Sequence, residues 1–87
     1  MQASEYQELC KHTAVYPEII GLSYVTLGLA GEAGEVANKV KKVYRDSGGA
    51  LNPTNTAAIA DEVGDVLWYC AMLCEELGLR LDDVMRG

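Results

Sequence analysis

Residues 28–42 read GLAGEAGEVANKVKK, a helical pattern that carries three glycines and two glutamates. Each glycine inside a helix costs roughly 1 kcal/mol relative to alanine, so three of them need a reason. Apolar residues at helical spacing extend this helix from about Leu22 to Tyr44, and Ser47-Gly48-Gly49 ends it. Glu32 and Glu35 are three residues apart and therefore lie on one side of the helix.

Three further helices and no strand are expected on either side of this stretch. The first is expected to begin with a cap at Ser4 and to end at the break Tyr16-Pro17. The third helix of the chain is expected to begin with a cap at Thr54 or Asn55 and to end near Leu77, and the last to begin near Leu81. The loop through Leu51-Asn52-Pro53 is short, so the second and third helices should form an antiparallel hairpin. The predicted fold class is all-α, a small helical bundle built on this hairpin and completed by oligomerisation.

Size, charge and cysteine content narrow the class of protein. The chain has 87 residues and a net charge of −6, which predicts one domain over residues 1–87 and argues against binding a nucleic-acid polymer. A domain of this size is marginally stable alone, and association with further copies is one remedy. Three cysteines without a framework spacing favour a reducing, cytoplasmic setting. Neither a signal peptide nor a membrane-spanning segment is expected.

The helical wheel separates an apolar stripe from an acidic flank on each long helix. The expected core stripes are Leu22, Leu29, Val36 and Val40 on the second helix, and Ile59, Val63, Val66, Cys70, Leu73 and Leu77 on the third. Glu32 and Glu35 fall roughly 60–120° from the first stripe, and Glu62 and Asp65 fall equally far from the second, in the same sense.

On both helices the acids are rotated from the apolar stripe by the same angle and in the same sense. When the helices pack antiparallel, both acidic flanks therefore lie on one side of the seam, the interface between the two helices. The two acid pairs also lie level to within about 5 Å along the hairpin. Four carboxylates this close would partly protonate unless a cation lies between them. Oxygen ligands of this kind suit Mg²⁺, with Mn²⁺ as the second choice. A di-iron centre is not expected, because the chain contains no Glu-x-x-His motif.

At these residues the chain resembles the MazG-like nucleotide pyrophosphohydrolases of the all-α NTP pyrophosphatase superfamily. The family signature is Glu-x-x-Glu, a spacer, and Glu-x-x-Asp, represented here by EAGE at 32–35 and EVGD at 62–65. GLAGEAGEVANKVKK, DEVGDVLWY and LDDVM also look like the phage and bacterial members. The resemblance covers most of the chain from about residue 20. Relatives usually continue with a basic C-terminal stretch, whereas this sequence stops at Met85-Arg86-Gly87, so phosphate contacts from such a stretch are not expected.

The resemblance implies Mg²⁺-dependent hydrolysis of nucleoside triphosphates to the monophosphate and pyrophosphate, with clearance of non-standard or surplus nucleotides as the task. The implied metal ligands are Glu32, Glu35, Glu62 and Asp65. The general base is expected to be Glu35, although the sequence does not separate it from Glu32. Lys39 is a candidate for offsetting charge on the phosphates, with an ordinary Glu35–Lys39 pair as the alternative.

Substrate contacts are further expected from Lys42, for which a solvated lysine is the simpler interpretation, and from Tyr69, which could stack on a base or pack in the core. Gly28 lies on the acidic flank, where a side chain would crowd metal or phosphate. Gly31 and Gly34 face the back of the hairpin, and with an exposed Trp68 they predict contact with a second subunit. The expected assembly is a homodimer or homotetramer, as is typical of the family.

Two other functions stay open from the sequence. One is a non-catalytic helical oligomerisation module whose acids are merely solvated, and the other is a Mg²⁺–nucleotide binder or regulator without turnover.

Overall fold

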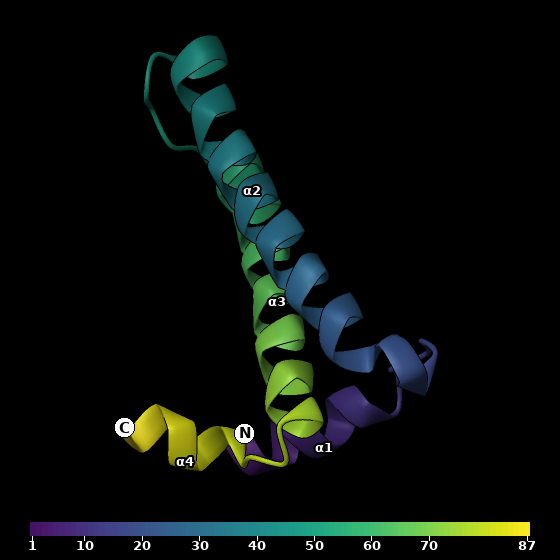
Figure 1. Ribbon diagram of the computed structural model, residues 1–87. Helices are drawn as coiled ribbons and strands as arrows, with labels where there is room; N and C mark the ends of the chain where they lie inside the picture. Colours follow the sequence, from purple (N-terminus) through teal and green to yellow (C-terminus); the bar gives the residue numbers. More distant parts are fainter.

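The computed structural model describes residues 1–87 and contains helices only, which confirms the all-α fold class. The elements in chain order are α1 (Ala3–Lys11), the 3₁₀ helix η1 (Glu18–Ile20), α2 (Gly21–Ser47), α3 (Pro53–Glu76) and α4 (Leu81–Arg86). Helices α2 and α3 form a long antiparallel hairpin, while α1, α4 and both chain termini lie at its open end (Figure 1). None of the helices combines the length and apolar character needed to cross a membrane.

Short-range hydrogen bonds set the turn of the hairpin. Gly48 ends α2 in the left-handed conformation, with φ of 59°, which glycine adopts without strain. Asn52 caps the start of α3, because its side chain accepts a hydrogen bond from the Asn55 backbone N–H at 2.8 Å. Asn55 returns a bond to the Asn52 N–H, also at 2.8 Å. The expected caps were therefore wrong by a few residues: Asn52 begins α3, and Gln2, not Ser4, precedes α1.

The buried core is small and lies at the open end of the hairpin. Cys10, Val25, Ala71 and Met72 form it, so α1 packs where α2 and α3 diverge. Trp68 packs partly against this cluster, and its indole N–H donates to Thr13 Oγ1 at 2.8 Å. Trp68 is therefore half-buried, and the expectation that it is exposed was wrong. Its contact with a second subunit stays a prediction.

The seam between α2 and α3 is rotated relative to the predicted core stripes. Val25 and Val43 are the buried valines of α2, and the residues at the intervening helical turns include Glu32 and Lys39, both half-buried. The predicted stripe residues Leu22 and Val40 are 51% and 38% exposed. On α3, Val63 and Leu77 are likewise exposed. The other predicted stripe residues are half-buried: Leu29, Val36, Ile59, Val66, Cys70 and Leu73. The apolar stripes therefore fill the helix interface only in part, and polar side chains share it.

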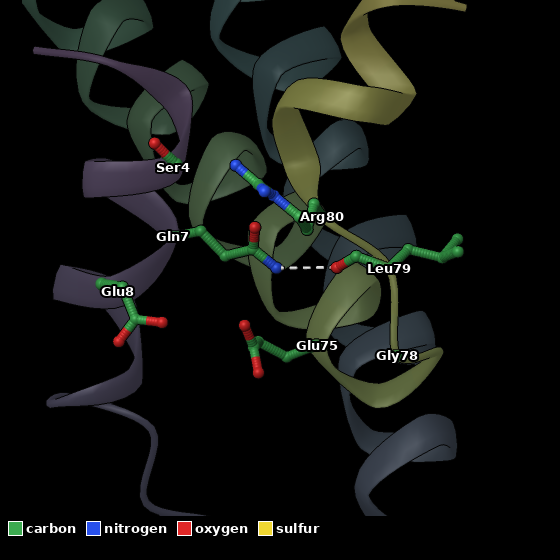
Figure 2. A pocket seen from close by; sticks show the side chains of 7 residues that line it. All are labelled: Ser4, Gln7, Glu8, Glu75, Gly78, Leu79 and Arg80. Atoms are coloured by element: carbon green, nitrogen blue, oxygen red, sulfur yellow. Dashed lines mark hydrogen bonds between the residues drawn. The ribbon is translucent and has the colours of Figure 1, made fainter.

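A buried glutamine fixes the connection between α3 and α4. The Gln7 side chain donates to the Leu79 carbonyl at 2.9 Å and accepts from the Leu81 N–H at 2.7 Å. Figure 2 shows Gln7 reaching from α1 to this linker across a cavity of about 400 Å³. The two acids at this cavity, Glu8 and Glu75, both lie within 4.0 Å of Lys11. Both acids are therefore paired within the chain, although they share one lysine.

Candidate functional site

Three carboxylates meet across the middle of the hairpin. Oxygens of Glu32 from α2, and of Glu62 and Asp65 from α3, lie within 4.8 Å of one another. Glu32 and Glu62 are half-buried in the seam, whereas Asp65 is exposed at its edge. The rotation of the seam explains this convergence, because it turns Glu32 and Glu62 toward each other.

No cation of the chain neutralises this group. The ion pairs of the structure involve Lys11, Arg45, Arg80 and Arg86, and none of these contacts Glu32, Glu62 or Asp65. The pKa of Glu32 is raised above its ordinary value. The first cause is a hydrogen bond with the Glu62 side chain, followed by burial and by repulsion from Asp65, Glu62 and Glu35. The negative charges of the cluster thus lie together where the chain provides no positive partner.

The donor set fits a hard divalent cation. Carboxylate oxygens are the protein ligands that Mg²⁺ and Mn²⁺ prefer, and both ions keep several waters when one or two carboxylates bind them. Asp65 is exposed, so water reaches the cluster from this edge. A bound cation would also relieve the repulsion that raises the pKa of Glu32.

Glu35 is the predicted ligand that the structure does not bring into this group. It lies one turn after Glu32 on α2, is exposed, and does not reach the three oxygens that lie within 4.8 Å of one another. The helical wheel puts Glu35 at the edge of the seam on the same side as Asp65. Glu35 is thus near the cluster but free of it, the arrangement that a proton acceptor beside a metal would need.

Two lysines follow the acids along α2. Lys39 and Lys42 are half-buried, and neither nitrogen lies within 4.0 Å of a carboxylate, so the alternative Glu35–Lys39 ion pair is not formed. Both line a cavity of about 240 Å³ near the hairpin turn.

Aromatic side chains lie on the other side of the acids, toward the open end of the hairpin. The Tyr69 ring lies against Gly28, where an added Cβ would overlap its Cε1 atom. The glycine is therefore required by a packed tyrosine, which corrects the expectation that it makes room for metal or phosphate. Tyr24 lies 6.5 Å from Tyr69 and stacks on Tyr16 at 4.9 Å between ring centroids. Tyr24 was not among the predicted site residues, although it lies one turn before Gly28 on the same side of α2.

The pKa of Tyr69 links this aromatic group to the acids. Burial raises it first, then contact with Tyr24, and then the negative charges of Glu32 and Asp65. Of the remaining glycines, Gly31 and Gly34 have no atom within 4 Å of an added Cβ, so the structure leaves the space beside them open.

Comparison with known proteins gives two matches. The sequence pattern of one family, the MazG nucleotide pyrophosphohydrolase domain, matches residues 22–87. The Gene 37 protein of Mycobacterium phage L5 is 47% identical over 90 residues, which cover 97% of this chain and 79% of the phage protein. No solved structure matches the chain.

Proposed function

Because this chain belongs to the MazG nucleotide pyrophosphohydrolase family, we propose that it hydrolyses nucleoside triphosphates to the monophosphate and pyrophosphate with Mg²⁺. The observation that carries the proposal is the convergence of Glu32, Glu62 and Asp65 within 4.8 Å without a positive partner. Clearance of non-standard or surplus nucleotides is the proposed task.

The acids have separate roles in this proposal. Glu32, Glu62 and Asp65 hold the cation, with Mn²⁺ as a substitute, and Glu35 is a fourth ligand directly or through water. A bound Mg²⁺ supplies charge neutralisation on the phosphates and lowers the pKa of a nearby water. Glu35, exposed beside the cluster, takes the proton from the attacking water. Glu32 is the second candidate for this step, because it lies one helical turn before Glu35 on α2.

Substrate contacts come from the two ends of the same seam. Lys39 and Lys42 offset the negative charge of the phosphates, because both are half-buried without a carboxylate partner. Tyr69, with Tyr24 beside it, offers an aromatic surface on which a base can stack.

We also propose that two copies associate through the apolar flank of the hairpin, in a dimer that a tetramer could extend. The radius of gyration is 14.9 Å, against about 12 Å for a compact chain of this length. The accessible surface is 5923 Å², about 900 Å² more than a compact chain of this size exposes. A standard interface buries about 800 Å² on each partner. The exposed Leu22, Val40, Val63 and Leu77 would be covered, whereas the acidic side would stay open.

A nucleotide panel tests the proposed activity. The protein is incubated with canonical, deoxy and oxidised nucleoside triphosphates plus Mg²⁺, and released pyrophosphate is measured. The proposal predicts turnover that Glu35→Gln abolishes and that Glu18→Gln, a matched change at an exposed acid of η1, leaves unchanged.

The other outcomes separate the alternative functions. Metal-dependent nucleotide binding without product would indicate a regulator and contradict the proposed hydrolysis. Absence of any metal-dependent nucleotide binding would indicate an interaction module.

A further inference from the structure

The cavity of about 240 Å³ near the hairpin turn has a polar lining that extends beyond the two lysines assigned to the phosphates. It lies between the last turns of α2 and the first turns of α3. Lys39, Lys42 and Ser47 contribute from α2, and Thr54 contributes from α3. No hydrogen bond within the chain occupies the hydroxyl of Ser47 or Thr54. Two ammonium groups and two hydroxyl donors thus line one space.

The distribution of positive charge singles out this cavity. The chain has seven lysines and arginines and a net charge of −6. Lys11, Arg45, Arg80 and Arg86 are each paired with a carboxylate. The remaining cations are Lys39, Lys41 and Lys42, all within one turn of α2. Two unpaired lysines line the cavity in a strongly acidic protein, which favours an anionic ligand there.

The cavity lies beside the acid cluster along the hairpin, on the side of the hairpin turn. Lys39 is two helical turns after Glu32, about 10 Å along α2, and Thr54 lies two turns before Glu62 on the antiparallel α3. Tyr69 lies two turns after Glu62, in the opposite direction. Along the seam, therefore, an aromatic surface, a carboxylate cluster and a cationic cavity follow one another.

We propose that this cavity binds the end of the phosphate chain that is remote from the nucleoside, and that it holds pyrophosphate after cleavage. The inference rests on the proposed function and gives the substrate a direction: the base lies toward Tyr69 and the terminal phosphates lie toward the hairpin turn. Lys39 and Lys42 supply the charge, while Thr54 and Ser47 donate to phosphate oxygens. Asp46 lines the cavity without repelling the ligand strongly, because it is paired with Arg45 at 2.7 Å.

Calorimetric titration of the full chain with pyrophosphate and Mg²⁺ tests the cavity directly. Lys42→Gln should weaken pyrophosphate binding about tenfold, the value of one charge-assisted hydrogen bond. Lys41→Gln is the matched control, since it removes the same charge from the adjacent exposed position, which does not line the cavity. Thr54→Val should weaken binding several-fold without changing charge. Equal weakening by the Lys41 and Lys42 variants, or none by Lys42→Gln, would overturn the proposal.

Product inhibition gives a second test that a merely structural role would not affect. Lys42→Gln should raise KM for the triphosphate and reduce inhibition by pyrophosphate, while inhibition by the nucleoside monophosphate stays within twofold. Equal loss of both inhibitions would overturn the assignment of the cavity to the terminal phosphates.

The calorimetric result also separates this inference from the proposed function. Lys42-dependent pyrophosphate binding in a protein that turns over no nucleotide would refute the hydrolysis and retain the phosphate cavity. Turnover combined with Lys42-independent pyrophosphate binding would retain the hydrolysis and refute the cavity.

Discussion

Buried or half-buried polar groups occur both at the junction, where α1 meets the linker to α4, and in the middle of the seam. The groups at the junction have hydrogen-bond partners, whereas the charges in the seam have no oppositely charged partner. At the junction, Gln7 uses both ends of its amide on the linker to α4. In the seam, Glu32 lies beside Glu62 and Asp65 without any cation, and no carboxylate lies within 4.0 Å of the Lys39 nitrogen. The paired polar groups of the junction stabilise the fold, whereas the carboxylates of the seam, which no cation neutralises, form the candidate metal site.

The largest expected effect comes from removing one seam carboxylate. Glu62→Gln should lower nucleotide turnover about 1000-fold, because metal-assisted charge stabilisation contributes several kcal/mol. The metal-free protein should be as stable as the wild type or more so, since the change removes repulsion with Glu32. Kinetics and chemical denaturation measure the two effects. A large loss of stability would show that Glu62 stabilises the fold and would contradict the contrast between seam and junction.

A change at the junction should have the opposite effect: it should lower the stability of the fold and leave nucleotide turnover unchanged. Gln7→Leu leaves the Leu79 carbonyl and the Leu81 N–H without partners, which should lower the free energy of unfolding by about 2–4 kcal/mol. Glu8→Gln, on an exposed acid of the same helix, should change it by less than about 1 kcal/mol. Turnover per folded molecule should be retained in both variants. Unchanged unfolding of Gln7→Leu would show that the junction is not held as described.

Two glycines of α2 give a smaller, matched contrast. Gly28→Ala places a Cβ against the Tyr69 ring and should cost about 1–2 kcal/mol after the gain in helix propensity. Gly31→Ala meets no atom within 4 Å and should stabilise the chain by up to about 1 kcal/mol. Thermal unfolding of both variants measures this. Equal stabilisation would mean that Tyr69 does not pack on Gly28, while destabilisation by Gly31→Ala would indicate a subunit contact at that surface.

The smallest effect is a dependence of stability on pH without metal. The pKa of Glu32 is raised in the fold, so the folded state binds this proton more tightly than the unfolded chain does. The contribution of Glu32 should therefore become more favourable as the pH falls through its raised pKa toward the ordinary value of 4.5. Denaturation of the wild type and Glu32→Gln across this range isolates the contribution. Identical pH profiles would contradict the repulsion inferred here.

The sequence predicted the helices, the hairpin and the approach of the acids, because helical periodicity and a short loop determine them. It did not predict the rotation of the seam. Leu22 and Val40 show the reason: an apolar stripe indicates a surface to be covered, but not whether its own chain or another copy covers it. As a result, the acids were expected on a flank, whereas Glu32 and Glu62 lie in the interface.

Long-range contacts were equally beyond the sequence pattern. Gln7 meets residues more than 70 positions away, and Trp68 meets Thr13 across 55 positions. Neither contact could be predicted from a periodic pattern in the sequence. The Glu-x-x-Glu and Glu-x-x-Asp signatures found the candidate ligands, but only the folded hairpin separates Glu35 from the other three.

Titration with Mn²⁺, followed by nuclear magnetic resonance of the backbone amides, tests the central claim most directly. Paramagnetic Mn²⁺ at low ratios should broaden the amide signals around Glu32, Glu62 and Asp65 first and leave those of Gln7 and Glu75 sharp, and excess Mg²⁺ should reverse the broadening. Broadening spread evenly over all exposed acids, or centred at the junction, would contradict a divalent-cation site in the seam.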